Sequence, residues 1–174
     1  GSQAVGMGKD LYENSNAAKE VFEIANSTLG KNISSLCFEG PEDDLKLTVN
    51  TQPSIVTMSI AALEAFKSEL DVEVSATAGH SLGEYSALVN AGAMKFADAV
   101  RIVRQRGQFM QEAVPVGEGS MSAVMGLAND KIVELCQKVE TETGLPVQAV
   151  NFNCPGQVVI AGATAAVDKA NEEM

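Results

Sequence analysis

The spacing of hydrophobic and polar residues divides the chain into two regions of different character. Over residues 9–113 apolar side chains recur mainly every three or four positions, a period that predicts helices. Residues 9–29 fit one or two helices that end at Gly30. Their apolar face consists of Leu11, Ala18, Val21, Phe22 and Ala25. Residues 36–47 are polar and irregular, with a turn at Gly40-Pro41 before the acidic start of a helix at residues 42–44.

The middle of the chain predicts a buried helix, a strand and a second helix. The buried helix is expected to begin near Thr51, because Pro53 suits the first turn of a helix. Its body, residues 55–70, is apolar on most faces. Residues 72–78, with two valines and a run of small residues, predict a short buried strand. Residues 84–90 then favour a helix that stops at a following glycine.

Residues 96–113 predict an amphipathic helix with one anomalous charge. The apolar arc contains Phe96, Ala99, Ile102, Val103, Phe109, Met110 and Ala113. The opposite face contains Arg101, Arg104, Gln105, Gln108 and Glu112. Arg106 falls within the apolar arc, where a guanidinium needs a partner because burying it alone is costly. Two interpretations stay open: a structural salt bridge to an internal carboxylate, or a fork that binds the carboxylate of a substrate.

The region after residue 117 has a different pattern, with strands and helices in the order β-α-β-β-α. Strands are predicted at residues 120–127, 147–153 and 157–161, and helices at residues 129–143, capped by Asn129, and from Ala163 onward. This order is that of a ferredoxin-like unit without its last strand. We therefore expect an α/β protein with domains at residues 1–116 and 117–174. We also expect the chain to start just after a first strand and to stop before a final one.

Composition narrows the classes of partner and cofactor. The chain is 45% hydrophobic and 5% aromatic, and its net charge is −11, which argues against nucleic acid and anionic membranes as partners. No apolar run reaches membrane-spanning length. Cys37, Cys136 and Cys154 are scattered and odd in number, which favours reduced cytoplasmic thiols over disulfides or a zinc site. No metal-ligand cluster or nucleotide-binding motif is present, so we expect no cofactor.

Residues 79–83 (GHSLG) match the G-x-S-x-G pattern of a nucleophile elbow. A strand before it and a helix after it would expose the hydroxyl of Ser81 at the tip of the turn, with the N–H of Leu82 as an oxyanion donor. The alternative is a glycine-rich turn with a structural serine. His80 is the only histidine. Adjacent side chains diverge on a sharp turn, so we expect His80 to pack beside the nucleophile and not to act as its base.

The chain contains five motifs in this order: residues 1–3 (GSQ), 51–53 (TQP), 79–86 (GHSLGEYS), 106–111 (RGQFMQ) and 151–157 (NFNCPGQ). Together they resemble malonyl-CoA:acyl carrier protein transacylases of the bacterial, stand-alone type. The resemblance implies an α/β-hydrolase-like large subdomain with an inserted ferredoxin-like small subdomain. It implies a monomeric, cytoplasmic, cofactor-free enzyme of fatty acid biosynthesis. Ser81 would carry malonyl from malonyl-CoA to the phosphopantetheine thiol of acyl carrier protein.

The resemblance also implies roles for other residues. Arg106 would bind the free carboxylate of the malonyl group, and Gln52 would lie near the active site. Asn151, Asn153 and Gln157 would face the cleft from the small subdomain, with Gln157 as a substrate contact. The catalytic histidine and the oxyanion glutamine of the family fall outside the 174 residues. We therefore expect the chain by itself not to turn over.

Three other interpretations fit parts of the sequence. An acyltransferase domain of a polyketide or multidomain fatty acid synthase shares the same motifs. A serine esterase or lipase shares the elbow, but its neutral substrates give Arg106 no role, so Arg106→Ala separates it from a malonyl transferase. The chain could also be a non-catalytic fragment that docks acyl carrier protein. Its basic surface would then be formed by Lys95, Arg101 and Arg104.

Overall fold

The computed structural model describes residues 2–115 and 117–174. Gly1, which begins the GSQ motif, and residue 116, the predicted domain boundary, lie outside the described residues. The chain forms two compact units, Gly1–Ala113 and Val114–Met174.

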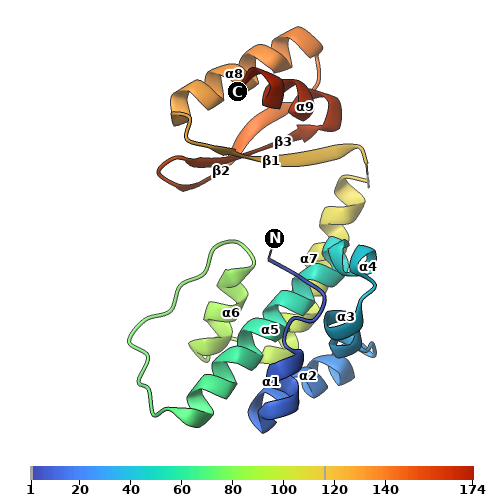
Figure 1. The fold of residues 1–174 in the computed structure, drawn as a ribbon, viewed down its shortest axis with the longest axis vertical. Helices are drawn as coiled ribbons and strands as arrows, with labels where there is room; N and C mark the ends of the chain where they lie inside the picture. The colour runs from blue at the N-terminus through green and yellow to red at the C-terminus, as the bar shows by residue number, and fades with distance from the viewer. Residues whose placement is uncertain (1, 116) are drawn as a thin grey trace. The chain divides into compact units, whose positions relative to one another are not determined.

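The first unit begins with two helices, α1 (Lys9–Asn14) and α2 (Asn16–Leu29), shown in blue in Figure 1. This confirms the prediction of one or two helices over residues 9–29. Ser15 separates the two helices and caps α2, because its hydroxyl accepts a hydrogen bond from the N–H of Ala18 at 3.3 Å. Gly30 ends α2 with a left-handed φ of 59°, as the sequence predicted.

The next segment is more helical than expected. It contains α3 (Ile33–Glu39) and α4 (Glu42–Lys46), so the prediction of an irregular stretch is wrong over α3. The side chain of Asn32 caps α3 by accepting from the N–H of Ser35 at 2.9 Å, and this N-cap was the signal that could have found the helix. α4 carries its acidic residues in the first turn, as predicted.

The central helix, α5 (Thr48–Glu69), begins at Thr48 instead of Thr51. Pro53 therefore lies inside the helix, and it lacks the N–H that would bond the carbonyl of Val49. Arg104 supplies a donor instead: its Nη1 lies 3.4 Å from that carbonyl oxygen. The sequence placed Arg104 on the face opposite the apolar arc, but its guanidinium is half-buried against the start of α5.

The segment between α5 and α6 (Gly83–Asn90) follows a long open course in Figure 1. The buried strand predicted at residues 72–78 is absent: residues 71–81 are all exposed and contain no strand. A strand is stable only beside another strand, and the described residues of the first unit contain none for this segment to pair with. The helix predicted after the elbow is confirmed by α6.

Helix α7 (Phe96–Ala113) packs against α2 and α5 through a stripe narrower than the predicted arc. The stripe consists of Ala99, Val100, Val103 and Gly107. Ile102, Phe109 and Met110 were predicted to be inside, but they are 38%, 63% and 48% exposed. The neighbouring helices contact α7 on one side only and cover one row of its side chains. The predicted arc was wider because it included every apolar residue, whether or not another helix covers it.

The core of the first unit is formed by side chains of α2, α3, α5 and α7, among them Phe22, Ile33, Val56 and Val103. Cys37 belongs to this core, and burial raises the pKa of its thiol to about 11. The thiol therefore stays protonated at neutral pH. All three cysteines are free, as the sequence predicted.

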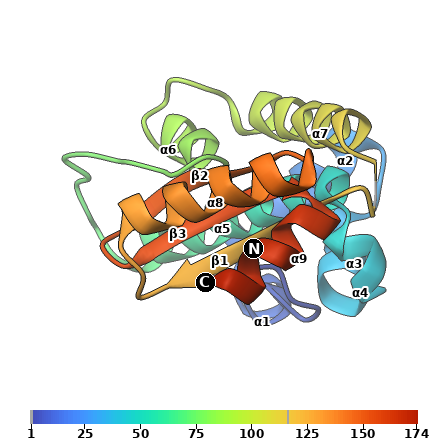
Figure 2. The ribbon, with the colours of Figure 1, turned by 90° about the horizontal axis from the view of Figure 1, so that it is seen from above.

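The second unit consists of β1 (Gly119–Met125), α8 (Asn129–Thr143), β2 (Val147–Cys154), β3 (Gln157–Ala163) and α9 (Thr164–Glu173). The predicted order β-α-β-β-α is confirmed. The sheet is antiparallel with the strand order β1-β3-β2. Both helices lie on the same face of the sheet in Figures 1 and 2. β2 and β3 follow each other along the chain and pair antiparallel, so they form one hairpin.

One face of this sheet is buried and the other is open. The buried side chains between the sheet and its helices include Val124, Ile132, Val147 and Ile160. On the strands, Met121 and Phe152 are 65% and 55% exposed. Asn129 was predicted to cap α8, but it is the first helical residue, and Ala128 occupies the cap position without a side-chain hydrogen bond.

Replacing Gly107 by alanine will destabilise the first unit by about 1–3 kcal/mol. A Cβ at this position would lie 2.6 Å from the carbonyl oxygen of Thr48 and 2.8 Å from the Cα of Val49, so α5 and α7 would have to move apart. The measurement is the urea unfolding midpoint. Gly83→Ala is the control, because a Cβ there meets no atom within 4 Å. Equal midpoints for the two variants would contradict the close helix contact.

Candidate functional site

The turn that carries Ser81 has an unusual backbone. Among the described residues Ser81 is the one non-glycine residue with a positive φ, 51°. This conformation costs a residue with a side chain about 1–2 kcal/mol. A Cβ at Gly79 would collide with the carbonyl group of Gly83, so the turn requires glycine there. A strained, exposed serine between glycines is the local geometry expected of a nucleophile elbow.

The start of α6 leaves one backbone donor free beside Ser81. The N–H of Gly83 donates to the carbonyl of His80 at 2.8 Å, and the N–H of Glu84 donates to the carbonyl of Ser81 at 3.3 Å. Within the described part of the chain, the N–H of Leu82 donates to no carbonyl. An unpaired N–H in the first turn of a helix can donate a hydrogen bond to an anion.

Arg106 on α7 contacts the elbow directly. Its Nη2 donates to Oγ of Ser81 at 2.9 Å, and its Nη1 donates to Oε1 of Gln52 at 2.6 Å. Across residues 2–115 and 117–174, no carboxylate forms an ion pair with Arg106. The structural salt bridge considered from the sequence therefore has no partner here. The guanidinium is half-buried with both partners neutral, so its positive charge is uncompensated.

Gln52 is only 4% exposed and connects Arg106 to the start of α5. Its Nε2 lies 2.9 Å from Oγ1 of Thr48 and 3.3 Å from the sulfur of Met110. The structure thus brings together Ser81, Arg106 and Gln52 from the elbow, α7 and α5. Sequence reasoning missed Thr48 because the helix was expected to start later; the spacing of four residues on one helix was the signal that could have found it.

His80, the only histidine, forms no side-chain hydrogen bond with Ser81 in the described structure. His80 was predicted to pack beside Ser81, but its side chain is exposed, as is the whole segment from residue 71 to residue 81. The neighbours of this turn contact its backbone and Ser81, whereas the side chain of His80 faces solvent. The hydrogen-bond partner of Oγ of Ser81 is Arg106, which can only donate.

The candidate residues of the second unit lie on the β2–β3 hairpin. Nδ2 of Asn153 donates to Oε1 of Gln157 at 3.0 Å, and Nε2 of Gln157 lies 3.3 Å from the sulfur of Met125. Asn151 is half-buried and pairs with Val159 in the ladder. The hairpin therefore brings Asn153 and Gln157 into contact, and it leaves the side chain of Asn153 exposed.

The basic surface considered for a carrier protein is weaker than the sequence suggested. Lys95 is exposed, but Arg101 is paired with Asp98 at 3.1 Å. Arg104 is turned toward α5, as described above. Two of the three positive charges are therefore partly engaged by neighbouring groups.

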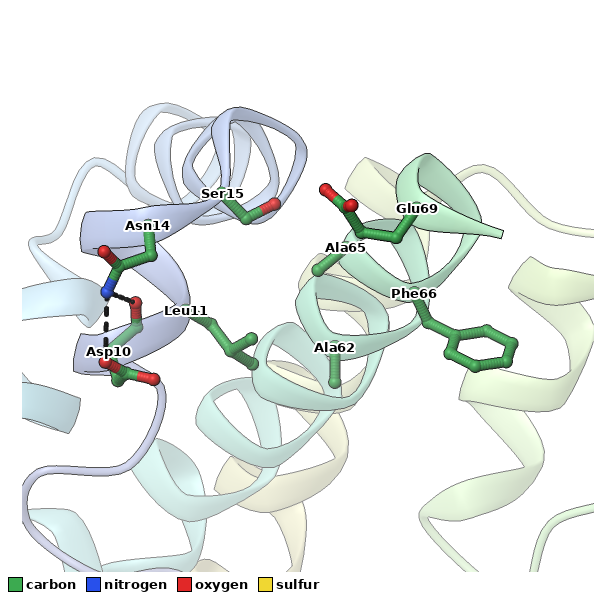
Figure 3. A pocket seen from close by; sticks show the side chains of 8 residues that line it. All are labelled: Asp10, Leu11, Asn14, Ser15, Ala62, Ala65, Phe66 and Glu69. Atoms are coloured by element: carbon green, nitrogen blue, oxygen red, sulfur yellow. Dashed lines mark hydrogen bonds between the residues drawn. The ribbon is translucent and has the colours of Figure 1, made fainter. Parts of the chain in front are cut away.

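A shallow hollow in the first unit lies apart from these residues. Figure 3 shows it between α1 and α5. Half of its lining residues are apolar and half are polar or acidic: Leu11, Ala62, Ala65, Phe66, Asn14, Ser15, Asp10 and Glu69. None of the candidate residues named above lines this hollow.

Across the described residues, no group of three or more histidine, cysteine or acidic side chains could hold a metal ion. Among the same residues, no helix has the length and apolar character needed to cross a membrane.

Comparison with known proteins assigns the family. The family described as acyl transferase domain matches the chain over residues 1–174. The chain belongs to this acyl transferase family. One relative is the malonyl CoA-acyl carrier protein transacylase of Bacillus subtilis strain 168. The two are 54% identical over 172 residues, which cover 99% of the chain and 54% of the relative. The predicted resemblance to malonyl-CoA:acyl carrier protein transacylases is confirmed.

Solved structures agree with this assignment. The malonyl CoA-acyl carrier protein transacylase of Coxiella burnetii matches with a TM-score of 0.93 and 42% identity, over 99% of the chain and 54% of that structure. A second structure, a malonyl-transacylase in complex with a type II polyketide synthase acyl carrier protein, matches with a TM-score of 0.91, 44% identity, and coverage of 99% and 55%. The mixed fold of helices and sheet is that of malonyltransferases. The chain spans about half the length of the curated relatives it matches.

Proposed function

We propose that the complete polypeptide carrying this chain transfers a malonyl group from malonyl-CoA to the phosphopantetheine thiol of an acyl carrier protein in fatty acid biosynthesis. The observation that carries the proposal is the hydrogen bond between Nη2 of Arg106 and Oγ of Ser81, 2.9 Å long. A nucleophile beside an uncompensated guanidinium suits an acyl group that itself carries a carboxylate. The names of the relatives, and the carrier protein bound to one of them, support the same reaction.

The reaction would proceed in two acyl transfers. Oγ of Ser81 attacks the thioester carbon of malonyl-CoA, the carbon–sulfur bond breaks, and coenzyme A leaves as a thiol with the proton that the serine lost. The phosphopantetheine thiol then attacks the ester carbon, the bond from that carbon to Oγ breaks, and Ser81 regains its hydroxyl with the proton that the thiol lost. Arg106 holds the free carboxylate, one methylene from the reacting carbon, and the N–H of Leu82 donates to the oxyanion.

The base for Ser81 is a separate part of the proposal. Among the described residues, the side chain that contacts Oγ of Ser81 through a hydrogen bond is Arg106, which can only donate and cannot take its proton. The family resemblance puts the catalytic histidine after the small subdomain, outside the 174 residues. We therefore propose that residues 1–174 by themselves do not turn over.

We further propose an α/β-hydrolase-like large subdomain in residues 1–116 and an inserted ferredoxin-like small subdomain in residues 117–174. The antiparallel order β1-β3-β2, with both helices on one face, supports the second assignment. In this arrangement Gln157, with Asn151 and Asn153 near it, would contact substrate from the β2–β3 hairpin. Acyl transfer is redox-neutral and needs no cofactor. The free cysteines support a cytoplasmic enzyme, and its monomeric state is part of the proposal.

Intact-mass spectrometry of the complete polypeptide with malonyl-CoA tests the proposed function. We expect a gain of one malonyl group, and peptide mapping should place it on the segment that contains Ser81. Addition of acyl carrier protein with its phosphopantetheine arm should remove the group from the protein and add it to the carrier. A polypeptide that takes no malonyl group, or takes it on another segment, would overturn the proposal.

A further inference from the structure

We infer that Gln52 determines acyl specificity, because it orients Arg106 through a neutral partner and leaves the guanidinium charge available to the substrate. The inference rests on the proposed function, and it goes beyond it by naming the residue that keeps Arg106 selective for an acyl carboxylate. Gln52 acts through Arg106, so its role is one of positioning.

The first step of the argument is that the amide of Gln52 has a single satisfactory orientation. A guanidinium only donates hydrogen bonds, so the group that faces Nη1 of Arg106 at 2.6 Å must be Oε1. The two hydrogens of Nε2 then face two acceptors, Oγ1 of Thr48 at 2.9 Å and the sulfur of Met110 at 3.3 Å. Reversing the amide would set a donor against a donor and leave buried polar atoms without partners.

The second step is that two helices hold this amide. Thr48 lies one turn before Gln52 on α5, and Met110 lies one turn after Arg106 on α7. The helices approach closely at Gly107, where a side chain would collide with the backbone of α5. The distance between Gln52 and Arg106 is therefore fixed by backbone contact, and the direction of the amide oxygen is fixed by Thr48 and Met110.

The third step concerns charge. A carboxylate at position 52 would orient Arg106 equally well, but it would also compensate its charge in a buried ion pair. Arg101 illustrates that case, since its guanidinium is paired with Asp98. The amide leaves a full positive charge within one hydrogen bond of Oγ of Ser81. An anionic acyl group is then bound better than a neutral one of similar size.

The experiment compares malonyl-CoA with acetyl-CoA as acyl donors for the complete polypeptide. The readout is the rate of acylation of Ser81, measured by intact-mass spectrometry. We expect Gln52→Glu to lower kcat/KM for malonyl-CoA at least about 30-fold. The kcat/KM for acetyl-CoA should stay within about threefold of that of the unmodified polypeptide. Gln105→Glu is the matched control: it makes the same change on the exposed face of α7 and should alter neither value.

A second variant keeps the test decisive if Gln52→Glu folds poorly. Thr48→Val keeps the shape of the side chain but removes the acceptor for Nε2. It should therefore lower the ratio of kcat/KM for malonyl-CoA to kcat/KM for acetyl-CoA, as Gln52→Glu does. Thr48→Ser, which keeps the hydroxyl, should restore this ratio. Parallel losses with both donors would show a structural role and overturn the inference. An unchanged ratio in both variants would overturn it too. If the unmodified polypeptide does not take malonyl on Ser81, that distinct result overturns the proposed function, and the inference that rests on it falls as well.

Discussion

Replacing Ser81 by alanine will abolish malonyl transfer by the complete polypeptide, with a loss of at least about 10⁴-fold in kcat. The methyl group cannot attack a thioester, and no other hydroxyl takes its place at the tip of the elbow. The turn itself should persist, because Gly79 and the start of α6 define it and alanine removes only one oxygen. Arg106 would lose one of its two neutral acceptors and keep Gln52.

The measurement is the steady-state transfer of radiolabelled malonyl to acyl carrier protein, beside the intact mass of the enzyme after exposure to malonyl-CoA. Ser75→Ala is the matched control, since Ser75 is an exposed serine of the same open segment and should leave both readouts unchanged. A Ser81→Ala enzyme that still gains a malonyl group would show that the nucleophile lies elsewhere.

Replacing Arg106 by alanine will lower kcat/KM for malonyl-CoA by about 100-fold or more. The variant loses the only positive charge that contacts Oγ of Ser81 among the described residues. A neutral acyl donor such as acetyl-CoA never used that charge, so its kcat/KM should change far less. Arg106→Lys should give an intermediate loss with malonyl-CoA, because an ammonium keeps the charge but not the two-pronged geometry.

The acylation half-reaction, measured without carrier protein, isolates this effect. Arg101→Ala is the control: it removes an exposed guanidinium from the same helix, one that is already paired with Asp98. Undiminished acylation of Arg106→Ala by malonyl-CoA would favour the esterase interpretation. Equal losses with malonyl-CoA and acetyl-CoA would mean that Arg106 supports the fold of the elbow and does not select the substrate.

Sequence alone determined the features that depend on neighbouring residues. Gly30 ends α2, the glycines at 79 and 83 bound the turn at Ser81, and the alternating patterns after residue 117 indicated the order of the second unit. Caps, turns and periodicity act over one or two helical turns, so a single chain shows them without knowledge of the fold. The anomalous position of Arg106 in an apolar arc was visible for the same reason.

The tertiary structure alone decided what depends on distant partners. The valines at 72 and 74 have the pattern of a strand, yet they lie exposed because no neighbouring strand among the described residues of their unit pairs with them. Likewise, only the tertiary structure shows that Arg106 on α7 meets the amide of Gln52 on α5 and the hydroxyl of Ser81 on the elbow, and no carboxylate. A sequence pattern shows that a buried charge needs a partner, but which side chain fills that place is set by contacts between residues more than 50 positions apart.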